Sequence, residues 1–195
     1  MRVIAGKYRS RPLQSLRGMD IRPTSDRLRE TLFNVLCAGN PDALAGTIWV
    51  DLCAGTGAVG IEALSRGAKE VHFVENSRAA TDAIRKNLQS LRIADHFHIV
   101  QQDLPQAVRR LERDGVVADV VFMDPPYRLE DLYAQTLRAL AASSLLRATS
   151  VVIAEHERKF DPGEEFASLR RVRQLVQGST ALSFYRLGSL SETAR

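Results

Sequence analysis

The fold of this chain is decided by the stretch VVFMDPPY, residues 120–127. Four successive apolar residues are typical of a buried parallel strand. The tetrapeptide DPPY then marks the carboxyl end of that strand, the edge where open α/β sheets bind ligands. Its two prolines remove backbone donors and fix φ, which leaves a rigid segment with a carboxylate, carbonyls and an aromatic ring. We interpret Asp124, Pro125 and Tyr127 as a pocket for a planar base with an exocyclic amine; the alternative is a Pro-Pro turn beside an incidental tyrosine.

Apolar runs that end in an acid recur along the chain. Stretches typical of helices lie between them, at residues 58–66, 77–91 and 104–113. Strands that alternate with helices predict right-handed crossovers and a parallel sheet. The acids then share one edge of that sheet, as expected for a ligand rich in hydroxyl groups and amines. The runs are residues 48–50, 71–74, 97–100 and 120–123, and the acids are Asp51, Glu75, Asp103 and Asp124.

The remaining segments complete a doubly wound α/β sheet. Residues 25–36 and 132–146 have the pattern of helices, and Thr24 or Ser25 can cap the first of them. We expect a fifth strand over residues 151–154 and a closing antiparallel pair over residues 169–176 and 181–187. The prediction is a Rossmann-like sheet, mostly parallel with an antiparallel C-terminal strand. The expected divisions are a small basic N-terminal hairpin or arm (residues 1–23), the sheet domain (24–187) and a disordered tail (188–195).

The turn DLCAGTG, residues 51–57, follows the first predicted strand. Its glycines let the backbone approach a ligand closely, and Gly60 lets the next helix pack against its strand. Cys53 stands where a dinucleotide site would have its phosphate-facing glycine, which disfavours a dinucleotide. Glu75 lies 20 residues after Gly55, the spacing at which a strand-end acid reaches ribose hydroxyls. Together with Asp103 and DPPY, this favours S-adenosylmethionine. The candidate cofactor-binding residues are Asp51, Cys53, Ala54, Gly55, Thr56, Gly57, Glu75 and Asp103.

These motifs resemble the Rossmann-fold S-adenosylmethionine-dependent methyltransferases, and most closely the bacterial 16S rRNA guanine-N2 methyltransferases of the RsmD type. The resemblance covers nearly the whole chain: MRVIAG (1–6), RPTSDRLRE (22–30), DLCAGTG, EALSRGA (62–68), FVE (73–75), DPPY and TALSFYR (180–186). It implies methyl transfer to N2 of a guanine, of the guanine 966 type. DPPY is shared with adenine-N6 methyltransferases and so indicates amine methylation without fixing the base. Cys53 departs from the family, in which Phe is more usual, and should alter packing near the cofactor.

Composition is that of one soluble domain. The chain has 195 residues, 45% of them apolar, and no run of 18 apolar residues that would suggest a membrane span. Its start, Met1 followed by a basic polar segment, does not have the pattern of a signal peptide. Cys37 and Cys53 predict neither a disulfide framework nor a metal site, so we expect a reducing cytoplasm and no metal. The four histidines lack ligand spacing with any cysteine and are interpreted as strand or surface residues.

Positive charge is concentrated at the N-terminus. Residues 1–30 carry eight Lys and Arg against three acids, a net charge of +5, and the rest carries 19 against 20. Clustered cations of this kind suit an electrostatic clamp on nucleic acid, and the alternative is a solvated tail. The helix over residues 25–36 is expected to hold the arm beside the cofactor. The candidate RNA-binding residues are Arg2, Lys7, Arg9, Arg11, Arg17 and Arg22.

The resemblance implies 16S rRNA as the partner, within an assembling 30S subunit, for a monomeric protein. S-adenosylhomocysteine would be the product. Two other hypotheses stay open at this point. One is an adenine-N6 or protein-glutamine methyltransferase with the same DPPY segment. The other is a non-catalytic RNA-binding assembly factor, which the intact strand-end acids argue against. We assign no chemistry to Glu155 and His156, which end the fifth predicted strand.

Overall fold

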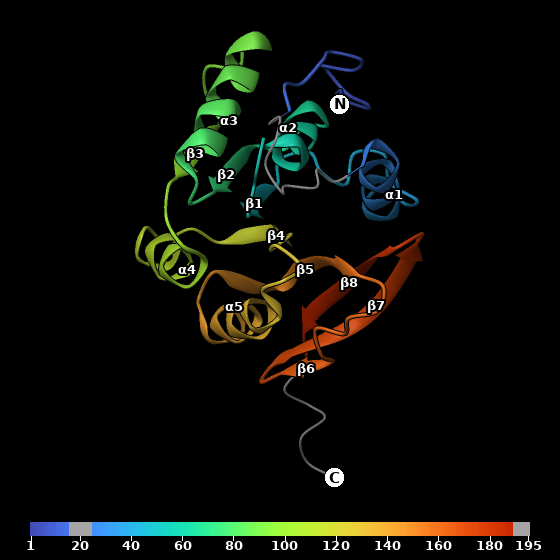
Figure 1. Ribbon diagram of the computed structural model, residues 1–195, viewed down its shortest axis with the longest axis vertical. Coiled ribbons are helices and arrows are strands. Elements are labelled where there is room, and N and C mark those ends of the chain that lie inside the picture. Colours follow the sequence, from blue (N-terminus) through green and yellow to red (C-terminus); the bar gives the residue numbers. More distant parts are fainter. Residues whose placement is uncertain (16–24, 189–195) are drawn as a thin grey trace. The chain divides into compact units, whose positions relative to one another are not determined.

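The computed structural model describes residues 1–15 and 25–188. The chain divides into two compact units, Met1–Asp103 and Leu104–Arg195 (Figure 1). No helix in these described ranges is long and apolar enough to cross a membrane.

The first unit is a three-stranded parallel sheet with three helices. β2 lies between β1 and β3, and all three strands run in the same direction, as the alternation of strands and helices predicts. In register, Trp49 of β1 is opposite Val71 of β2, and Asp51 is opposite Phe73. The elements are α1 (Asp26–Leu36), β1 (Ile48–Leu52), α2 (Ala58–Ser65), β2 (Glu70–Val74), α3 (Arg78–Ser90) and β3 (Phe97–Val100).

Helices of the first unit pack on one face of this sheet. The Phe33 ring of α1 stacks on Trp49 of β1, with ring centroids 5.4 Å apart. Gly60 of α2 lies against β2, because a Cβ atom at this position would stand 2.4 Å from the Phe73 ring and 2.8 Å from Val71. Trp49, Val71 and Phe73 share one face of the pleated sheet. The predicted role of Gly60 in close helix-strand packing is confirmed.

Residues 1–15 form a hairpin that packs on α2 and α3. Arg2 pairs with Pro12 across the hairpin, and Val3 and Leu13 are buried. The backbone N–H of Lys7 donates to the Ser65 carbonyl at 2.7 Å, at the end of α2. The predicted hairpin therefore exists, and it is held on the first unit rather than projecting from it. Its proposed boundary at residue 23 lies outside the described residues.

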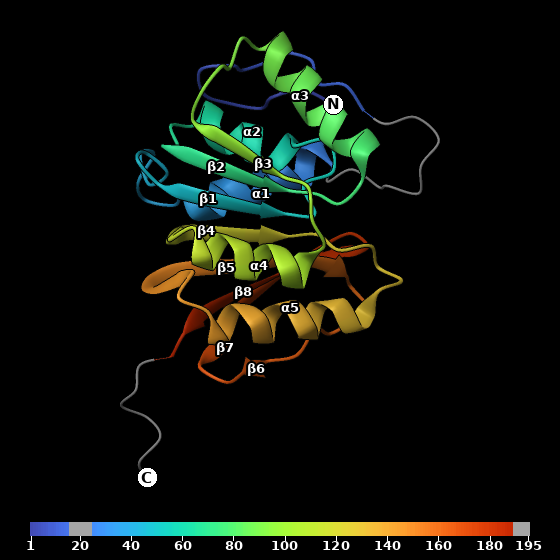
Figure 2. The same cartoon turned by 90° about the vertical axis from the view of Figure 1, so that its left-hand side faces the viewer.

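The second unit is a mixed sheet. Its order is β4-β5-β8-β7-β6, parallel between β4 and β5 and antiparallel thereafter. α4 and α5 lie side by side on the same side of the β4–β5 strands (Figure 2). The elements are α4 (Leu104–Arg113), β4 (Ala118–Met123), α5 (Glu130–Ala142), β5 (Leu146–Glu157), β6 (Glu165–Phe166), β7 (Leu169–Gln177) and β8 (Thr180–Leu187).

Two predicted bounds in this unit are wrong. The helix expected over residues 132–146 ends at Ala142, because Ser143 adopts an extended conformation as its C-cap. The strand expected over residues 151–154 runs from Leu146 to Glu157. β5 has partners on both sides, and pairing with β8 continues through the polar residues at its end. The predicted closing antiparallel pair is confirmed by β7 and β8. Of the predicted tail, Gly188 is described, and residues 189–195 lie outside the described part.

Replacing Gly60 by Ala should destabilise the chain by about 1–3 kcal/mol, because the added Cβ overlaps the Phe73 ring in a packed interface. Helix propensity alone would favour Ala at this position by about 1 kcal/mol, so the sign of the change is diagnostic. Urea unfolding measures it. Adding Phe73→Leu should cost less in the Gly60→Ala background than in the wild type, and equal costs in both backgrounds would show that the two residues are not in strained contact.

Candidate active site

The glycine loop, residues 51–57, leaves β1 through a series of left-handed residues. Cys53, Gly55 and Gly57 have φ values of 61°, 54° and 79°. Gly55 is half-buried and carries no Cβ, so the backbone can come close to a ligand there. Gly57 is buried, and a Cβ at this position would meet Ile84 at 3.2 Å and Phe73 at 3.3 Å. Cys53 adopts a conformation that favours glycine, at the position where the sequence departs from the family pattern. Of the other predicted cofactor residues in the loop, Ala54 and Thr56 are buried.

Asp51 lies beneath the glycine loop and is only 1% exposed. Its Oδ2 accepts the backbone N–H of Gly60 at 2.9 Å, which ties the end of β1 to the first turn of α2. The pKa of the Asp51 carboxyl is raised from 3.8 to about 7, mainly by burial; the Gly60 N–H opposes the rise, and the nearby Glu75 charge makes a smaller contribution to it. In this structure Asp51 supports the loop from below.

Glu75 follows β2 and holds the glycine loop at that end of the sheet. Its Oε2 accepts the N–H of Gly55, and its Oε1 accepts the N–H of Ser77, each at 2.9 Å. The side chain is half-buried. An ionised carboxylate has about four acceptor positions, so two remain for hydroxyl groups of a ligand. The spacing of 20 residues between Gly55 and Glu75 thus corresponds to a direct contact.

Asp103 follows β3 and is exposed. Its Oδ1 accepts a hydrogen bond from the Asn76 side chain at 2.9 Å. The backbone carbonyl of Asn76 in turn accepts from the side-chain amide of Gln101 at 3.5 Å. Asn76, the residue after Glu75, therefore connects the end of β2 to the acid that follows β3. Asn76 was not among the residues expected from the sequence; the signal that could have found it is an amide directly after a strand-end acid. The first unit brings Asp51, Glu75 and Asp103 to the carboxyl ends of its three parallel strands.

A second missed residue, Asn87 of α3, is fully buried behind the glycine loop. Its Nδ2 donates to the Thr56 carbonyl at 2.9 Å and to the Gln14 carbonyl at 3.2 Å. Its Oδ1 accepts the N–H of Gln14 at 2.7 Å. One amide side chain thus fixes both the loop and the end of the N-terminal hairpin. Nothing in the local sequence of α3 distinguishes it, since its partners are 31 and 73 residues away.

The DPPY segment follows β4 in the second unit. Asp124 and Tyr127 are half-buried, and Pro125 is buried. The Tyr133 hydroxyl of α5, another group that the sequence analysis missed, lies 3.1 Å from the Pro125 carbonyl and 2.9 Å from the Glu155 carbonyl. Its single proton is donated to one of them or shared. This contact fixes the direction of the Pro125 carbonyl and leaves it a second lone pair.

Glu155 and His156, to which the sequence analysis assigned no chemistry, have structural contacts. The His156 Nδ1 lies 2.8 Å from the Glu157 carbonyl and so carries a proton, and its Nε2 then accepts from the Ser183 hydroxyl at 2.9 Å. Burial lowers the pKa of this imidazole. His156 is therefore a neutral link between β5 and β8.

The basic residues of the hairpin are exposed. Arg2, Lys7, Arg9 and Arg11 all reach solvent. The Lys7 ammonium lies 5.3 Å from the centre of the Tyr8 ring, and the Arg11 guanidinium donates to the Ser90 carbonyl at 3.2 Å. The last two candidates, Arg17 and Arg22, lie outside the described residues.

Comparison with known sequences identifies relatives over nearly the whole chain. A family profile described as Conserved hypothetical protein 95 matches residues 1–186. The ribosomal RNA small subunit methyltransferase D of Escherichia coli strain K12 is 33% identical over 193 residues, which covers 99% of this chain and 93% of the relative. The protein of the same name from Haemophilus influenzae is 33% identical over 159 residues, which covers 81% and 79%.

A solved structure gives the same result at the level of the fold. The Escherichia coli protein yhhF superimposes with a TM-score of 0.79 at 33% identity, covering 96% of this chain and 98% of that one. The Rossmann-like methyltransferase fold expected from the sequence is confirmed.

The buried Asp51 should make stability depend on pH. Because the folded-state pKa of about 7 exceeds the unfolded value, the unfolded chain ionises first, and stability is lost as pH rises from about 4 to about 7. Asp51→Asn keeps an acceptor for Gly60 and removes this titration. The stability of the variant relative to wild type should therefore increase by up to about 1.4 kcal/mol per pH unit in that range. Urea unfolding at several pH values measures the difference, and a difference independent of pH would contradict the assignment.

Proposed function

This chain belongs to the Conserved hypothetical protein 95 family, and we propose that it transfers a methyl group from S-adenosylmethionine to the exocyclic N2 amine of a guanine in 16S rRNA. The observation that carries the proposal is the Glu75 carboxylate, which binds the glycine loop and retains acceptor positions at the carboxyl ends of the strands. The relatives named ribosomal RNA small subunit methyltransferase D support the choice of substrate.

The residues of the first unit fit an adenosyl cofactor. Glu75 would accept hydrogen bonds from the ribose hydroxyls through its remaining lone pairs. Asp103, oriented by Asn76, would accept from the amino group of the adenine. The left-handed backbone at Gly55 would let the loop lie close to the methionine part.

The bound cofactor supplies an electrophilic sulfonium methyl group, so the protein needs to supply alignment more than activation. Asp124 and the Pro125 carbonyl would accept the two hydrogens of the target amine and leave its lone pair directed at the methyl group. The amine nitrogen would displace S-adenosylhomocysteine from the methyl carbon, and the proton released from the methylated amine would pass to the Asp124 carboxylate. Correct alignment of this kind can lower the barrier by roughly 7–11 kcal/mol. Tyr133 contributes by holding the Pro125 carbonyl.

Access to the amine requires the base to leave its stack. Unstacking costs a few kcal/mol, and stacking on the Tyr127 ring would recover about 1–3 kcal/mol. These terms nearly cancel, so much of the affinity has to come from contacts with phosphates. The exposed cations Arg2, Lys7, Arg9 and Arg11 of the hairpin are suited to them. We propose that the substrate is rRNA within an assembling small subunit and that the protein acts as a monomer.

Asp124→Ala should lower the single-turnover rate of methyl transfer about a hundredfold or more, because the amine loses an acceptor that fixes its orientation. Cofactor affinity should stay within a few fold. The measurement uses labelled S-adenosylmethionine and small-subunit particles from a strain lacking the gene. Nucleoside digestion should give N2-methylguanosine. In wild-type reactions, methyladenosine in this digest, methylglutamine in hydrolysed protein, or no transfer at all would each replace the proposal by one of its alternatives.

Glu75→Ala is the matched variant for the cofactor site: it should weaken cofactor binding, whereas Asp124→Ala should slow methyl transfer. Loss of hydrogen bonds to the ribose, worth about 1.5–3 kcal/mol, should raise the dissociation constant of the cofactor at least tenfold. Calorimetry on the folded variant measures it. Unchanged affinity would remove Glu75 from the cofactor site, while a normal turnover rate in Asp124→Ala would remove Asp124 from the amine site.

Replacing Lys7 and Arg9 by Ala should weaken RNA binding and leave cofactor binding intact. The backbone hydrogen bonds that hold the hairpin are retained, so the change is one of charge. The slope of log affinity against log salt should flatten by about 0.7–0.9 for each phosphate that the variant no longer neutralises. The control is Arg109 and Arg113 to Ala, two exposed cations of α4, which removes the same charge elsewhere. Equal reductions of affinity in both variants would make the effect one of net charge and not of the hairpin.

A further inference from the structure

Three side chains with metal-binding atoms meet on β2 and β3 of the first unit. Glu70 and His72 are two residues apart on β2 and therefore share a face of the sheet. His98 of β3 is directly opposite His72 in the parallel register. Val71 and Phe73, which pack against α2, point to the other face. The three side chains thus gather on the face of this sheet that α2 does not cover.

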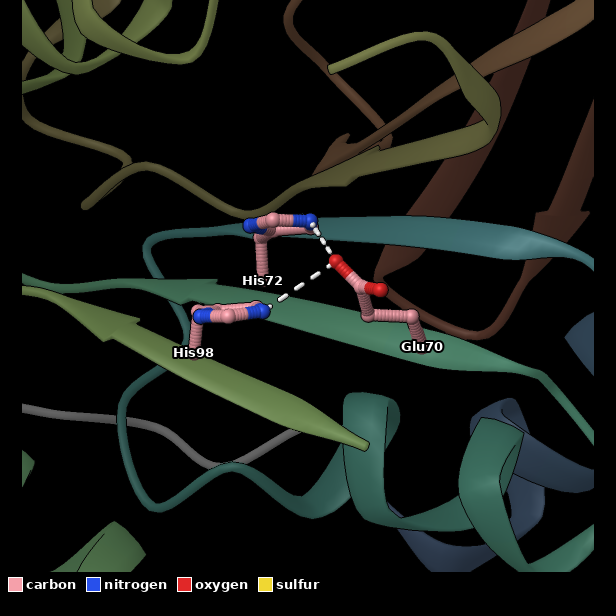
Figure 3. A group of neighbouring side chains, drawn as sticks. All are labelled: Glu70, His72 and His98. Atoms are coloured by element: carbon pink, nitrogen blue, oxygen red, sulfur yellow. Dashed lines mark ion pairs between the residues drawn. The ribbon is translucent and has the colours of Figure 1, made fainter. Parts of the chain in front are cut away.

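Their ligand atoms converge on one point (Figure 3). The Nε2 atom of His72 lies 2.7 Å from Oε1 of Glu70, and the Nε2 atom of His98 lies 3.2 Å from the same oxygen. One ligand atom from each residue lies within 4.8 Å of the others. The two imidazole rings stack with centroids 4.8 Å apart. Among the described residues, these three form the one group of His, Cys, Asp or Glu side chains whose ligand atoms lie close enough together to share an ion.

We propose that Glu70, His72 and His98 form a binding site for a divalent transition-metal ion of the zinc type. Two imidazole nitrogens and one carboxylate oxygen are a donor set that Zn²⁺, Co²⁺ and Ni²⁺ accept, whereas Mg²⁺ and Ca²⁺ prefer oxygen alone. Three protein ligands leave a further position for water. The site is open to solvent, because the side chains of His98 and Glu70 are 59% and 30% exposed. His72, at 7%, is the fixed ligand.

Coordination requires one local adjustment. An imidazole binds a metal with the lone pair in its ring plane, and the planes of His72 and His98 are only 16° apart. The His98 ring therefore has to tilt toward His72, which its exposure permits. Bonds of about 2.0–2.1 Å to zinc would place the ligand atoms somewhat over 3 Å apart. The Glu70 oxygen lies 2.7 Å and 3.2 Å from the two nitrogens, so rotation of the exposed His98 side chain would complete the set.

The metal site is separate from the proposed active site. Glu70 is the first residue of β2 and His98 the second residue of β3, so both lie toward the amino ends of their strands. Glu75 and Asp103 follow the carboxyl ends of the same strands. Metal binding can therefore be tested on protein without cofactor or RNA, and failure of either proposal leaves the other standing.

The test is calorimetric titration of the full, untagged chain with Zn²⁺ and Co²⁺. We expect one ion per chain, with a dissociation constant in the micromolar range or below, and no comparable binding of Mg²⁺ or Ca²⁺. His98→Ala and Glu70→Gln should each weaken binding at least about tenfold, while thermal melting confirms that both variants fold. The matched control is His96→Asn, which removes a neighbouring exposed imidazole and tolerates the positive φ of 66° at that position. Its affinity should stay within twofold of wild type.

The spectrum of the Co²⁺ complex identifies the ligands. Nitrogen and oxygen ligands should give weak visible bands without intense thiolate absorption, which distinguishes this site from Cys37 or Cys53. Absence of micromolar binding, equal affinity in His98→Ala and wild type, or a thiolate spectrum would each overturn the proposal. The three side chains would then be an ion-paired link between β2 and β3.

Discussion

The first unit depends on one buried carboxylate, that of Glu62 in α2. Its side chain is fully shielded from solvent, and its two oxygens accept the backbone N–H groups of Ile4 at 2.7 Å and Ala5 at 2.9 Å. The Arg66 guanidinium donates to it at 2.8 Å, and that of Arg29 lies 4.0 Å away. A buried charge is tolerated only where it is paired and hydrogen-bonded. Glu62 meets this condition by binding α1, α2 and the hairpin at once.

Arg29 extends the same arrangement. Its guanidinium is buried, donates to the Arg2 carbonyl, and pairs with Asp26 at 2.9 Å. Burial lowers the pKa of Arg29, and the charges of Asp26 and Glu62 oppose that shift. The hairpin that displays the proposed RNA-binding cations is therefore attached through its backbone to buried ions. Arg11 adds a side-chain contact to Ser90, while Lys7 contributes to the attachment through its backbone, and the exposed side chains of Lys7 and Arg9 stay available for phosphates.

Features of this fold that depend on neighbours in sequence could be predicted, and those that depend on distant residues could not. Ser25 caps α1, one of the two residues expected to do so, because the chemistry of capping lies within three residues. The strand-end acids follow from the order of strands and helices. In contrast, the burial of Asp51, the two roles of Asn87 and the contact of Tyr133 with Pro125 depend on residues brought together by packing. The convergence of His72 and His98 depends on strand register, which the sequence between β2 and β3 does not reveal.

Asn87 also connects the hairpin to the glycine loop through hydrogen bonds of one side chain. It satisfies the Gln14 backbone and the Thr56 carbonyl with a single buried amide. A displacement of Gln14 would remove two of its three hydrogen bonds and loosen the support of the loop. A ligand that displaced Gln14 would thus also change the support of the loop. A ligand bound at the loop would then change the affinity for the first ligand by the same factor, because thermodynamic linkage is reciprocal.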